Sequence, residues 1–222
     1  MPCIYELICL PTSVLFSLIE FAETLLGLIG YRPFRFNGPL TSGVLTYMSI
    51  RDEIRDRARE TPPRLFFLPP LIASVAMVRE MFVSEEIMEA VQPPWPATEE
   101  GRRLAQMRAY LDGWTEGRLI TVADLPYRKP KATTMARIDP VEDEVFDIRC
   151  VDPKPGIRVL GCFADFDLFV ALTWNQRENL EDDKAWRDEI ERCKAAWRRL
   201  LNPYTPFHGA SLNEYLSNFH PV

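Results

Sequence analysis

The sequence predicts an α+β fold, in which an antiparallel meander of three or four strands is covered by helices and preceded by an N-terminal helical extension. Residues 144–175 contain three consecutive apolar runs separated by short turns, which is typical of a meander. Residues 98–114 and 181–201, on either side, repeat tryptophan and aliphatic side chains at helical spacing. The chain has 222 residues, of which 47% are hydrophobic, and this is enough for a core without disulfides.

Residues 1–47 differ in composition from the rest and are predicted to be an apolar extension, separable from the core. Val14–Gly30 is apolar but contains two glutamates, each of which would cost about 3 kcal/mol at the centre of a bilayer, so no membrane span is predicted. A helix that is buried or covered by a partner is expected instead. Met48 precedes a helix cap, Ser49, as at a natural start, and the sequence does not decide between Met1 and Met48.

The second segment, residues 48–97, is predicted to be helical. Ser49 is expected to cap a charged helix over Ile50–Glu60, and Ser84 a short helix that follows. Between them, a core helix is predicted from four apolar side chains at helical spacing: Leu71, Val75, Val78 and Phe82.

The third segment, residues 98–222, is predicted to be one α+β domain with a C-terminal helix and tail. Thr98 is the expected cap of its first helix. The three strands of the meander are predicted over Glu144–Val151, Ile157–Asp165 and Leu168–Asn175. The last helix, residues 181–201, presents a stripe that includes Trp186 and Trp197 and is expected to cover the sheet.

Composition and motifs exclude several classes of function. A multi-histidine metal site is excluded because the chain has two histidines, and the patterns GxxxxGK[ST], GxGxxG and GxSxG do not occur. Five cysteines without CxxC spacing argue against a disulfide framework, and Cys150 and Cys162, which lie in adjacent predicted strands, are expected to be buried free thiols. The acidic stretch from Asp139 to Asp147 predicts a solvated loop, with a hard-cation site as the alternative. No metal and no cofactor is therefore predicted.

Basic side chains gather around the predicted meander, although the formal net charge of −6 excludes a strongly basic nucleic-acid binder. A buried unpaired arginine is costly, so arginines within apolar strands need a reason. One alternative is internal pairing with Asp147, Asp165 or Asp167. The other is a concave face that grips phosphates, for which the guanidinium group is well suited. The basic residues are Lys129, Lys131, Arg149, Arg158 and Arg177.

The order of strands and basic residues forms a pattern that extends over about residues 98–200. It reads Phe146-Asp147-Ile148-Arg149, Ile157-Arg158-Val159-Leu160 and Val170-Ala171-Leu172-Thr173-Trp174, followed by Arg177. This pattern resembles the RelE/ParE-like toxin superfamily, and within it the phage-derived HigB-type branch. That branch has a strand ending in Leu-Arg, then a Tyr-Arg-Val strand, then a Leu-Leu-His-Gly-Phe-type strand followed by lysines.

The resemblance implies a metal-independent endoribonuclease that cuts ribosome-bound mRNA. The residues that would stabilise the charge developing at the scissile phosphate are Arg149, Arg158 and Arg177. Those that would bind the RNA are Lys129, Lys131 and Trp174. The chain departs from the family in being long and acidic, and only His208 and Tyr204 are candidates for the C-terminal histidine or tyrosine of such enzymes.

Three hypotheses follow. The first is a RelE-like toxin domain that acts on RNA, with the ribosome or a cognate antitoxin as partner. The second is a non-catalytic protein-interaction module on the same fold, from a phage or another mobile element. The third is a membrane-surface protein that uses Val14–Gly30. A cytoplasmic location is expected, and DNA is not an expected partner.

Overall fold

The structure, a computed structural model, describes residues 49–123 and 133–222, which belong to the second of two units in the chain, Tyr47–Val222. The helices are α2 (Ile50–Arg59), α3 (Glu85–Val91), α4 (Glu99–Thr115) and α5 (Asp183–Leu201), with short 3-10 helices η1 (Val141–Asp143), η2 (Arg177–Asn179) and η3 (Leu212–Glu214). The strands are β1 (Phe66–Phe67), β2 (Glu80–Val83), β3 (Ile120–Ala123), β4 (Met135–Arg137), β5 (Phe146–Cys150), β6 (Ile157–Asp165), β7 (Leu168–Gln176) and β8 (Phe219–Pro221).

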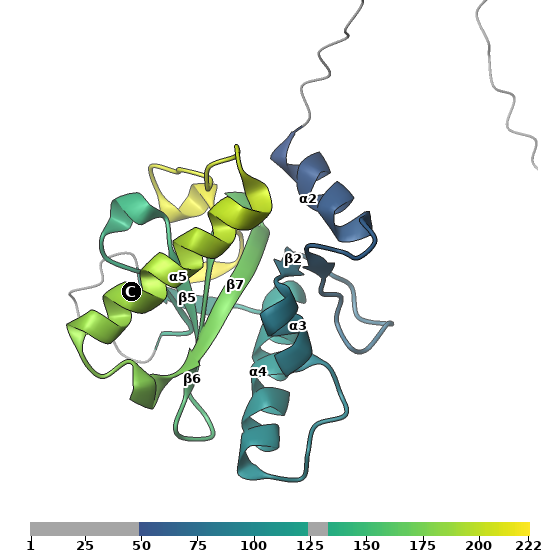
Figure 1. Cartoon of the computed structure of the whole chain (residues 1–222), viewed down its shortest axis with the longest axis vertical. Coiled ribbons are helices and arrows are strands. Elements are labelled where there is room, and N and C mark those ends of the chain that lie inside the picture. Colours follow the sequence, from purple (N-terminus) through teal and green to yellow (C-terminus); the bar gives the residue numbers. More distant parts are fainter. Residues whose placement is uncertain (1–48, 124–132) are drawn as a thin grey trace, which may run out of the picture. The chain divides into compact units, whose positions relative to one another are not determined.

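The eight strands form one mixed sheet in the order β1-β2-β7-β6-β5-β4-β3-β8. Figure 1 labels β2, β7, β6 and β5 of this sheet. The central strands β5, β6 and β7 pair in antiparallel fashion through two short turns. Parallel pairs lie on both sides of this centre, where β2 joins β7, and β3 joins both β4 and β8. Segments 48–97 and 98–222 therefore contribute to the same sheet.

The predicted fold class, a three- or four-stranded antiparallel meander, is wrong, because the sheet has eight strands and contains parallel pairs. The strands outside the predicted meander are two to four residues long, too short for an alternating pattern to emerge. The core helix predicted over Leu71–Phe82 is also wrong. That stretch is a loop followed by β2, and Leu71 and Val78 are exposed.

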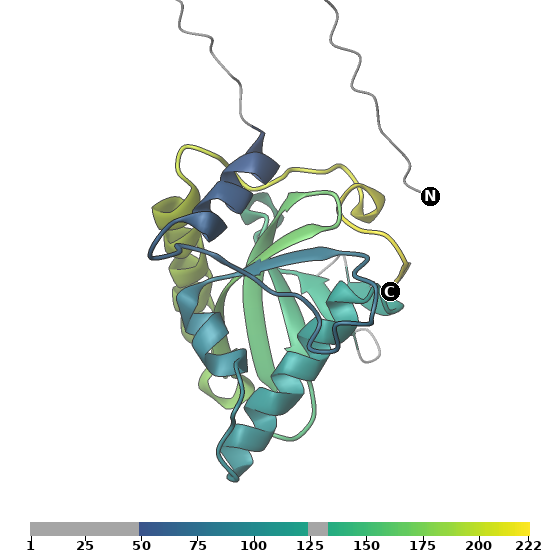
Figure 2. The same cartoon turned by 90° about the vertical axis from the view of Figure 1, so that its right-hand side faces the viewer.

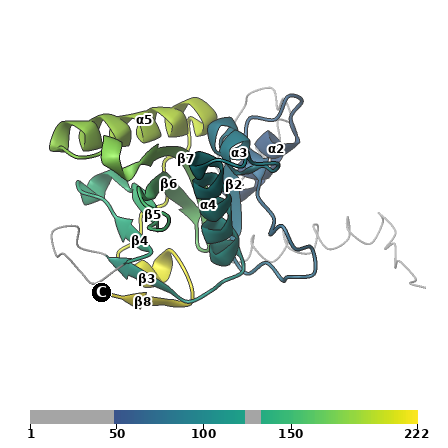
Figure 3. The same cartoon turned by 90° about the horizontal axis from the view of Figure 1, so that it is seen from below.

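Helices cover both faces of the sheet. One face, called the α4 face below, packs against α3, α4 and the segment Leu212–Leu216. The other, called the α5 face, packs against α2 and α5. Figures 1 and 3 show α5 along its face of the sheet, and Figure 2 shows α4 in front of the strands. Each face has its own buried apolar cluster, so the sheet is the middle of three layers.

The alternation of side chains along β5 decides where its charges lie. Phe146, Ile148 and Cys150 belong to the apolar cluster of the α4 face. Because successive side chains in a strand point to opposite faces, Asp147 and Arg149 point to the α5 face. The first predicted catalytic arginine therefore lies under the helix layer that contains α5.

The core of the α4 face is largely aromatic. The Phe163 ring centroid lies 5.0 Å from those of Phe146 and Phe169, and 5.4 Å from that of Tyr215. Trp114 of α4 completes the group, with its ring centroid 5.8 Å from that of Phe169. Tilted and edge-on contacts of this kind stabilise a core beyond the apolar area that they bury.

A bulge interrupts the pairing of β6 with β7. The register shifts between Leu160 and Gly161, which leaves Leu172 as the extra residue of β7. The carbonyl oxygen of Leu172 accepts a hydrogen bond from Ser84 Oγ at 2.7 Å. At Gly161 the strands approach so closely that a Cβ would lie 2.1 Å from the carbonyl oxygen of Val170. The bulge therefore ties β7 to the start of α3.

Candidate functional site

The three predicted catalytic arginines lie near one another. Arg149 of β5 and Arg158 of β6 are direct register partners. Arg177 begins η2, immediately after β7, and its charge acts on Arg158. The convergence that was expected from the order of strands is therefore present around the α5 face.

A single buried carboxylate lies between the first two arginines. Asp147 Oδ2 is 3.0 Å from Arg149 Nε and 3.4 Å from Arg158 Nε, and 1% of the Asp147 side chain is exposed. Arg149 also donates to the hydroxyl of Thr133. Asp147 was one of the three aspartates considered as internal partners, and it neutralises one of the two positive charges.

Arg158 is the more deeply buried of the pair. Burial lowers the pKa of Arg158, Asp147 acts in the opposite direction, and the charges of Arg149 and Arg177 lower this pKa further. Its Nη1 has no hydrogen-bond partner among the described residues. Arg158 therefore keeps one donor that the described part of the fold does not use.

Arg177 is held by neutral groups. Its Nη1 donates to the carbonyl oxygen of Leu180, and its guanidinium carbon lies 5.8 Å from the centroid of the Trp186 ring. Arg158 and Arg177 line an open cavity of 810 Å³. Its other charged residues are Lys154, Glu178 and Glu181, so cations and carboxylates are mixed there.

The predicted RNA-binding residues do not join this cluster within the described residues. Trp174 pairs with Val159 and packs against the apolar cluster of the α4 face, whereas Arg158 points to the α5 face. Lys129 and Lys131 lie outside the residues that the structure describes.

The acidic stretch at the start of β5 is solvated only in part, because Asp139 and Glu142 are exposed whereas Glu144 and Asp147 are buried. Among the described residues no group of acidic, histidine or cysteine side chains is arranged to hold a metal ion. Asp143 lies 2.7 Å from Lys194 of α5, and Asp147 contacts the two arginines. Glu144, which belongs to the same acidic stretch, is buried in a left-handed conformation with φ 55°, and its burial was not expected from the sequence.

Glu144 connects the C-terminal tail to the sheet. Its carboxylate lies 2.6 Å from Arg137 Nη2 and accepts a hydrogen bond of 2.6 Å from the Tyr215 hydroxyl. His208 Nδ1 contacts the same carboxylate, while 75% of the His208 side chain is exposed. Burial and the contact with Glu144 raise the pKa of Tyr215 to about 12. The charge of Glu144 is thus satisfied from three sides.

A second feature that sequence reasoning missed is an exposed apolar loop, Pro69–Val78, between β1 and β2. It contains no charged residue. Leu71, Ile72 and Val78 expose 51%, 63% and 55% of their surfaces. The sequence signal was present, but helical spacing was taken as the sign of a buried helix.

Hydrogen bonds fasten both ends of this loop to α4. Arg108, paired with Asp112 at 2.8 Å, donates to the carbonyl oxygen of Pro69. At the other end, the backbone N–H groups of Val78 and Arg79 donate to the carbonyl oxygen of Thr115 at 2.8 and 3.0 Å. The exposed side chains of the loop therefore lie on a backbone whose two ends are held in place.

The chain matches no protein-family model, no curated protein and no solved structure. The resemblance to RelE/ParE-like toxins stays a prediction. Within residues 49–123 and 133–222, no helix combines the length and the apolar character that crossing a membrane requires. The three cysteines of these ranges, Cys150, Cys162 and Cys193, are free and buried, as predicted for Cys150 and Cys162.

Proposed function

We propose that this protein is a non-catalytic protein-interaction module, which binds a partner through the apolar loop. The observation that carries the proposal is a run of large apolar side chains, Leu71, Ile72 and Val78, exposed on a backbone held at both ends. Exposed apolar surface of this kind is typical of binding sites, because water contact is costly unless a partner covers it.

The partner is an amphipathic helix of another protein. Pro69 and Pro70 have no backbone N–H, and this disfavours the addition of a strand along this part of the chain. Recognition then depends on side chains. The apolar stripe of a helix supplies them at i, i+3 and i+4 without any need for charge complementarity.

The contacts of Asp147 support interaction over catalysis. A cation that stabilises a phosphate in a transition state must be free to meet it. Arg149 and Arg158 instead share the Asp147 carboxylate, at 3.0 and 3.4 Å. The buried free thiols support the predicted cytoplasmic location, where cysteines stay reduced.

The test is site-specific photo-crosslinking in cells, with the crosslinking residue at Ile72 and, as control, at Leu119, which is exposed to 67% and lies outside the loop. Any partner protein that crosslinks at Ile72 but not at Leu119 is then purified. Its affinity is measured by titration against the double variant Leu71→Glu/Ile72→Glu and against Leu119→Glu. The proposal expects binding to be lost in the first and kept in the second.

The proposal fails if equal products form at Ile72 and Leu119, or if the loop variant binds as well as wild type. It fails also if Ile72 crosslinks to a second copy of this chain, because the surface is then a self-association site.

RNA binding is the second candidate. The observation that favours it is the cavity lined by Arg158 and Arg177, together with the unpartnered Nη1 of Arg158. In this candidate function, the arginines would contact RNA phosphates. The toxin hypothesis also implies the ribosome and an antitoxin as partners. Binding should weaken steeply with salt, because phosphate contacts release counterions.

Arg177→Ala tests this candidate, because Arg177 is not part of the Asp147 pair. The matched control is Arg102→Ala, which removes the same charge from an exposed position on α4. Loss of low-salt RNA binding in the first variant alone supports the candidate. Equal RNA binding by the two variants, or no RNA binding by the wild-type protein, contradicts it. A separate assay, RNA cleavage in the presence of a metal chelator, tests the hypothesis of a metal-independent endoribonuclease.

A further inference from the structure

Strand β7 is longer than the strand that pairs with it on the β2 side. β2 pairs with β7 from Leu168 to Ala171, whereas β7 continues to Gln176. Within residues 49–123 and 133–222, no strand pairs with this side of β7 beyond Ala171. Residues 172–176 therefore form a free edge, about 16 Å long at about 3.3 Å per residue.

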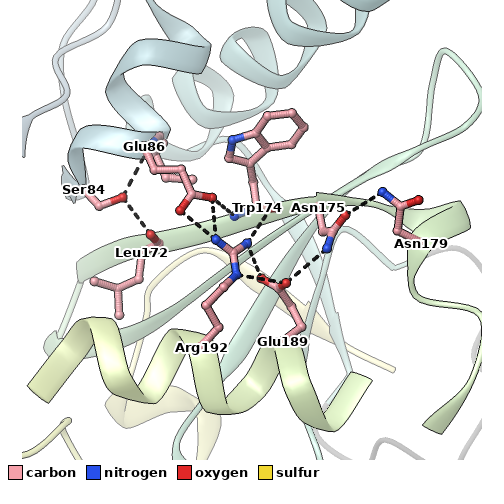
Figure 4. A network of polar contacts seen from close by, with 9 residues as sticks. Ser84, Glu86, Leu172, Trp174, Asn175, Asn179, Glu189 and Arg192 are labelled. Carbon is pink, nitrogen blue, oxygen red and sulfur yellow. Dashed lines mark hydrogen bonds and ion pairs between the residues drawn. The ribbon is translucent and has the colours of Figure 1, made fainter. Parts of the chain in front are cut away.

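Side chains take the place of a strand along this free edge (Figure 4). Ser84 Oγ donates to the carbonyl oxygen of Leu172 at 2.7 Å. The backbone N–H of Trp174 donates to Glu86 at 3.3 Å, and the carbonyl oxygen of Trp174 accepts a hydrogen bond from Arg192 Nη2 at 2.8 Å. Arg192 Nη1 lies 2.9 and 2.7 Å from the two carboxylate oxygens of Glu86. The pair of Glu86 and Arg192 thus makes the contacts with Trp174 that a neighbouring strand would make.

This ion pair, called the edge cover below, is accessible to solvent. The exposed fractions of the Arg192 and Glu86 side chains are 42% and 40%. Such pairs contribute little to stability, because water and salt screen them. Arg192 also lies 2.8 Å from Glu189, which is 5% exposed, and it can keep this partner when it leaves Glu86. An incoming backbone can therefore replace the edge cover without leaving a buried charge unpaired.

The space beside the free edge is open. A cavity of 510 Å³ lies there, lined by Leu172 and Thr173 of β7 and by residues of α3 and α5. On the α5 side, two of the lining residues are Ala195 and Ala196, whose side chains are small. Neighbouring strands of a sheet lie about 4.8 Å apart, so an added strand needs room directly beside β7. The cavity supplies this room.

We propose that an extended segment of another protein adds to β7 as a strand and displaces the edge cover. This surface is separate from the apolar loop. In strand addition, backbone hydrogen bonds supply the affinity and alternate side chains supply the specificity.

The walls of the cavity define the side chains of the added segment. The α3 wall carries three glutamates, and the α5 wall carries alanines and arginines. Because successive side chains of a strand point to opposite faces, the segment alternates basic residues with small apolar ones. The basic residues face Glu85, Glu86 and Glu89, and the small residues face Ala195 and Ala196.

The test is calorimetric titration of the full-length protein with the end-blocked peptide Lys-Val-Lys-Val-Lys-Val-Lys. Two matched peptides carry N-methyl groups, one on every valine nitrogen and the other on every lysine nitrogen. In a strand added to β7, the N–H groups of one residue type point to β7 and those of the other point away. The proposal expects one methylated peptide to bind as the parent does. The other should bind at least about tenfold more weakly, a difference of about 1.4 kcal/mol.

Three variants place the binding on this edge. Ala195→Trp fills the cavity and should abolish binding of the parent peptide. Its matched control is Ala109→Trp, at an exposed alanine of α4 outside the cavity, which should bind as wild type does. Arg192→Gln removes the group that occupies the carbonyl oxygen of Trp174, and it should tighten binding at least about threefold.

The proposal is overturned if the parent peptide gives no saturable heat at millimolar concentration, or if the two methylated peptides bind alike, because charge alone then explains the binding. It is overturned also if Ala109→Trp weakens binding as much as Ala195→Trp, or if Arg192→Gln weakens it. A dimer of the wild-type protein in analytical ultracentrifugation that Ala195→Trp abolishes has the same consequence, because the free edge then pairs with a second copy of this chain.

Discussion

Asp147→Asn should destabilise the protein far more than Arg158→Ala. The Asp147 carboxylate lies 3.0 Å from Arg149 and 3.4 Å from Arg158, and it is almost fully buried. Without it, two guanidinium groups face each other with no carboxylate between them. Breaking a buried pair in this way costs about 3–5 kcal/mol, because the stranded charge stays desolvated.

Arg158→Ala strands no charge, because Asp147 keeps its shorter contact with Arg149. The substitution also removes a guanidinium whose charged form burial disfavours, as the lowered pKa of Arg158 indicates. What remains is the loss of the ion pair with Asp147 at 3.4 Å, offset by that relief. We expect a cost of about 1.5 kcal/mol, the size of one contact between charged groups.

Urea unfolding followed by circular dichroism measures both costs, provided that the slope of the free energy against urea stays constant. The double variant Asp147→Asn/Arg158→Ala should cost less than the sum of the single variants, because one of the stranded charges is gone. Equal costs for the two single variants, or strict additivity in the double variant, would refute the assignment of Asp147 as the shared partner.

Three further predictions concern the core and its titrating groups. Trp197→Ala should cost about 3–5 kcal/mol in urea unfolding, because Trp197 is 2% exposed and its loss leaves a cavity. Burial and Glu144 raise the pKa of Tyr215 from 10.0 to about 12, so stability should fall as pH rises from 10 to 12, and less steeply in Tyr215→Phe. With Cys3 and Cys9 replaced by serine, a thiol reagent should label Cys150, Cys162 and Cys193 only on unfolding; fast labelling of native protein would contradict their burial.

The parts of the fold that the sequence predicted correctly depend on local signals. Ser49, Ser84 and Thr98 cap helices through their side chains, as expected. The predicted strand Ile157–Asp165 has the bounds observed for β6, and the last helix begins within two residues of its predicted start. In each case a cap, a turn or a long periodic stripe lies within a few residues of the element that it specifies.

Pairings between distant segments left no such signal. β2 pairs in parallel with β7, in the register Glu80 with Leu168, and no local pattern reveals a partner so far along the chain. The apolar residues from Leu71 to Phe82 are spaced as in a helix, but the chain places Phe82 in β2 and leaves Leu71 exposed. The helix predicted here was wrong because helical spacing over a short stretch does not show which residues become buried.

The candidate site divides in the same way. That Arg149 and Arg158 are neighbours follows from the predicted meander, since adjacent antiparallel strands with a short turn bring them together. The choice of Asp147 over Asp165 and Asp167 as their partner does not follow. It depends on the pleat, which points Asp147 and Arg149 to the same face of β5. Asp165 instead contacts Arg51 of α2, and Asp167 lies 3.6 Å from Arg79.

Buried arginines and a buried glutamate hold the segments whose sequence shows no period. Arg79 is fully buried and donates to the carbonyl oxygens of Trp114, Arg118, Ser217 and Asn218. It thereby joins the end of α4 to the C-terminal tail. Arg108 holds the apolar loop in the same manner, and Glu144 holds the tail through Tyr215. Because a buried charge is costly unless it is paired or hydrogen-bonded, these contacts fix one backbone geometry where apolar packing would allow several. A sequence pattern shows which residues are charged, but their burial depends on carbonyl groups from distant segments, and these become neighbours only in the folded chain.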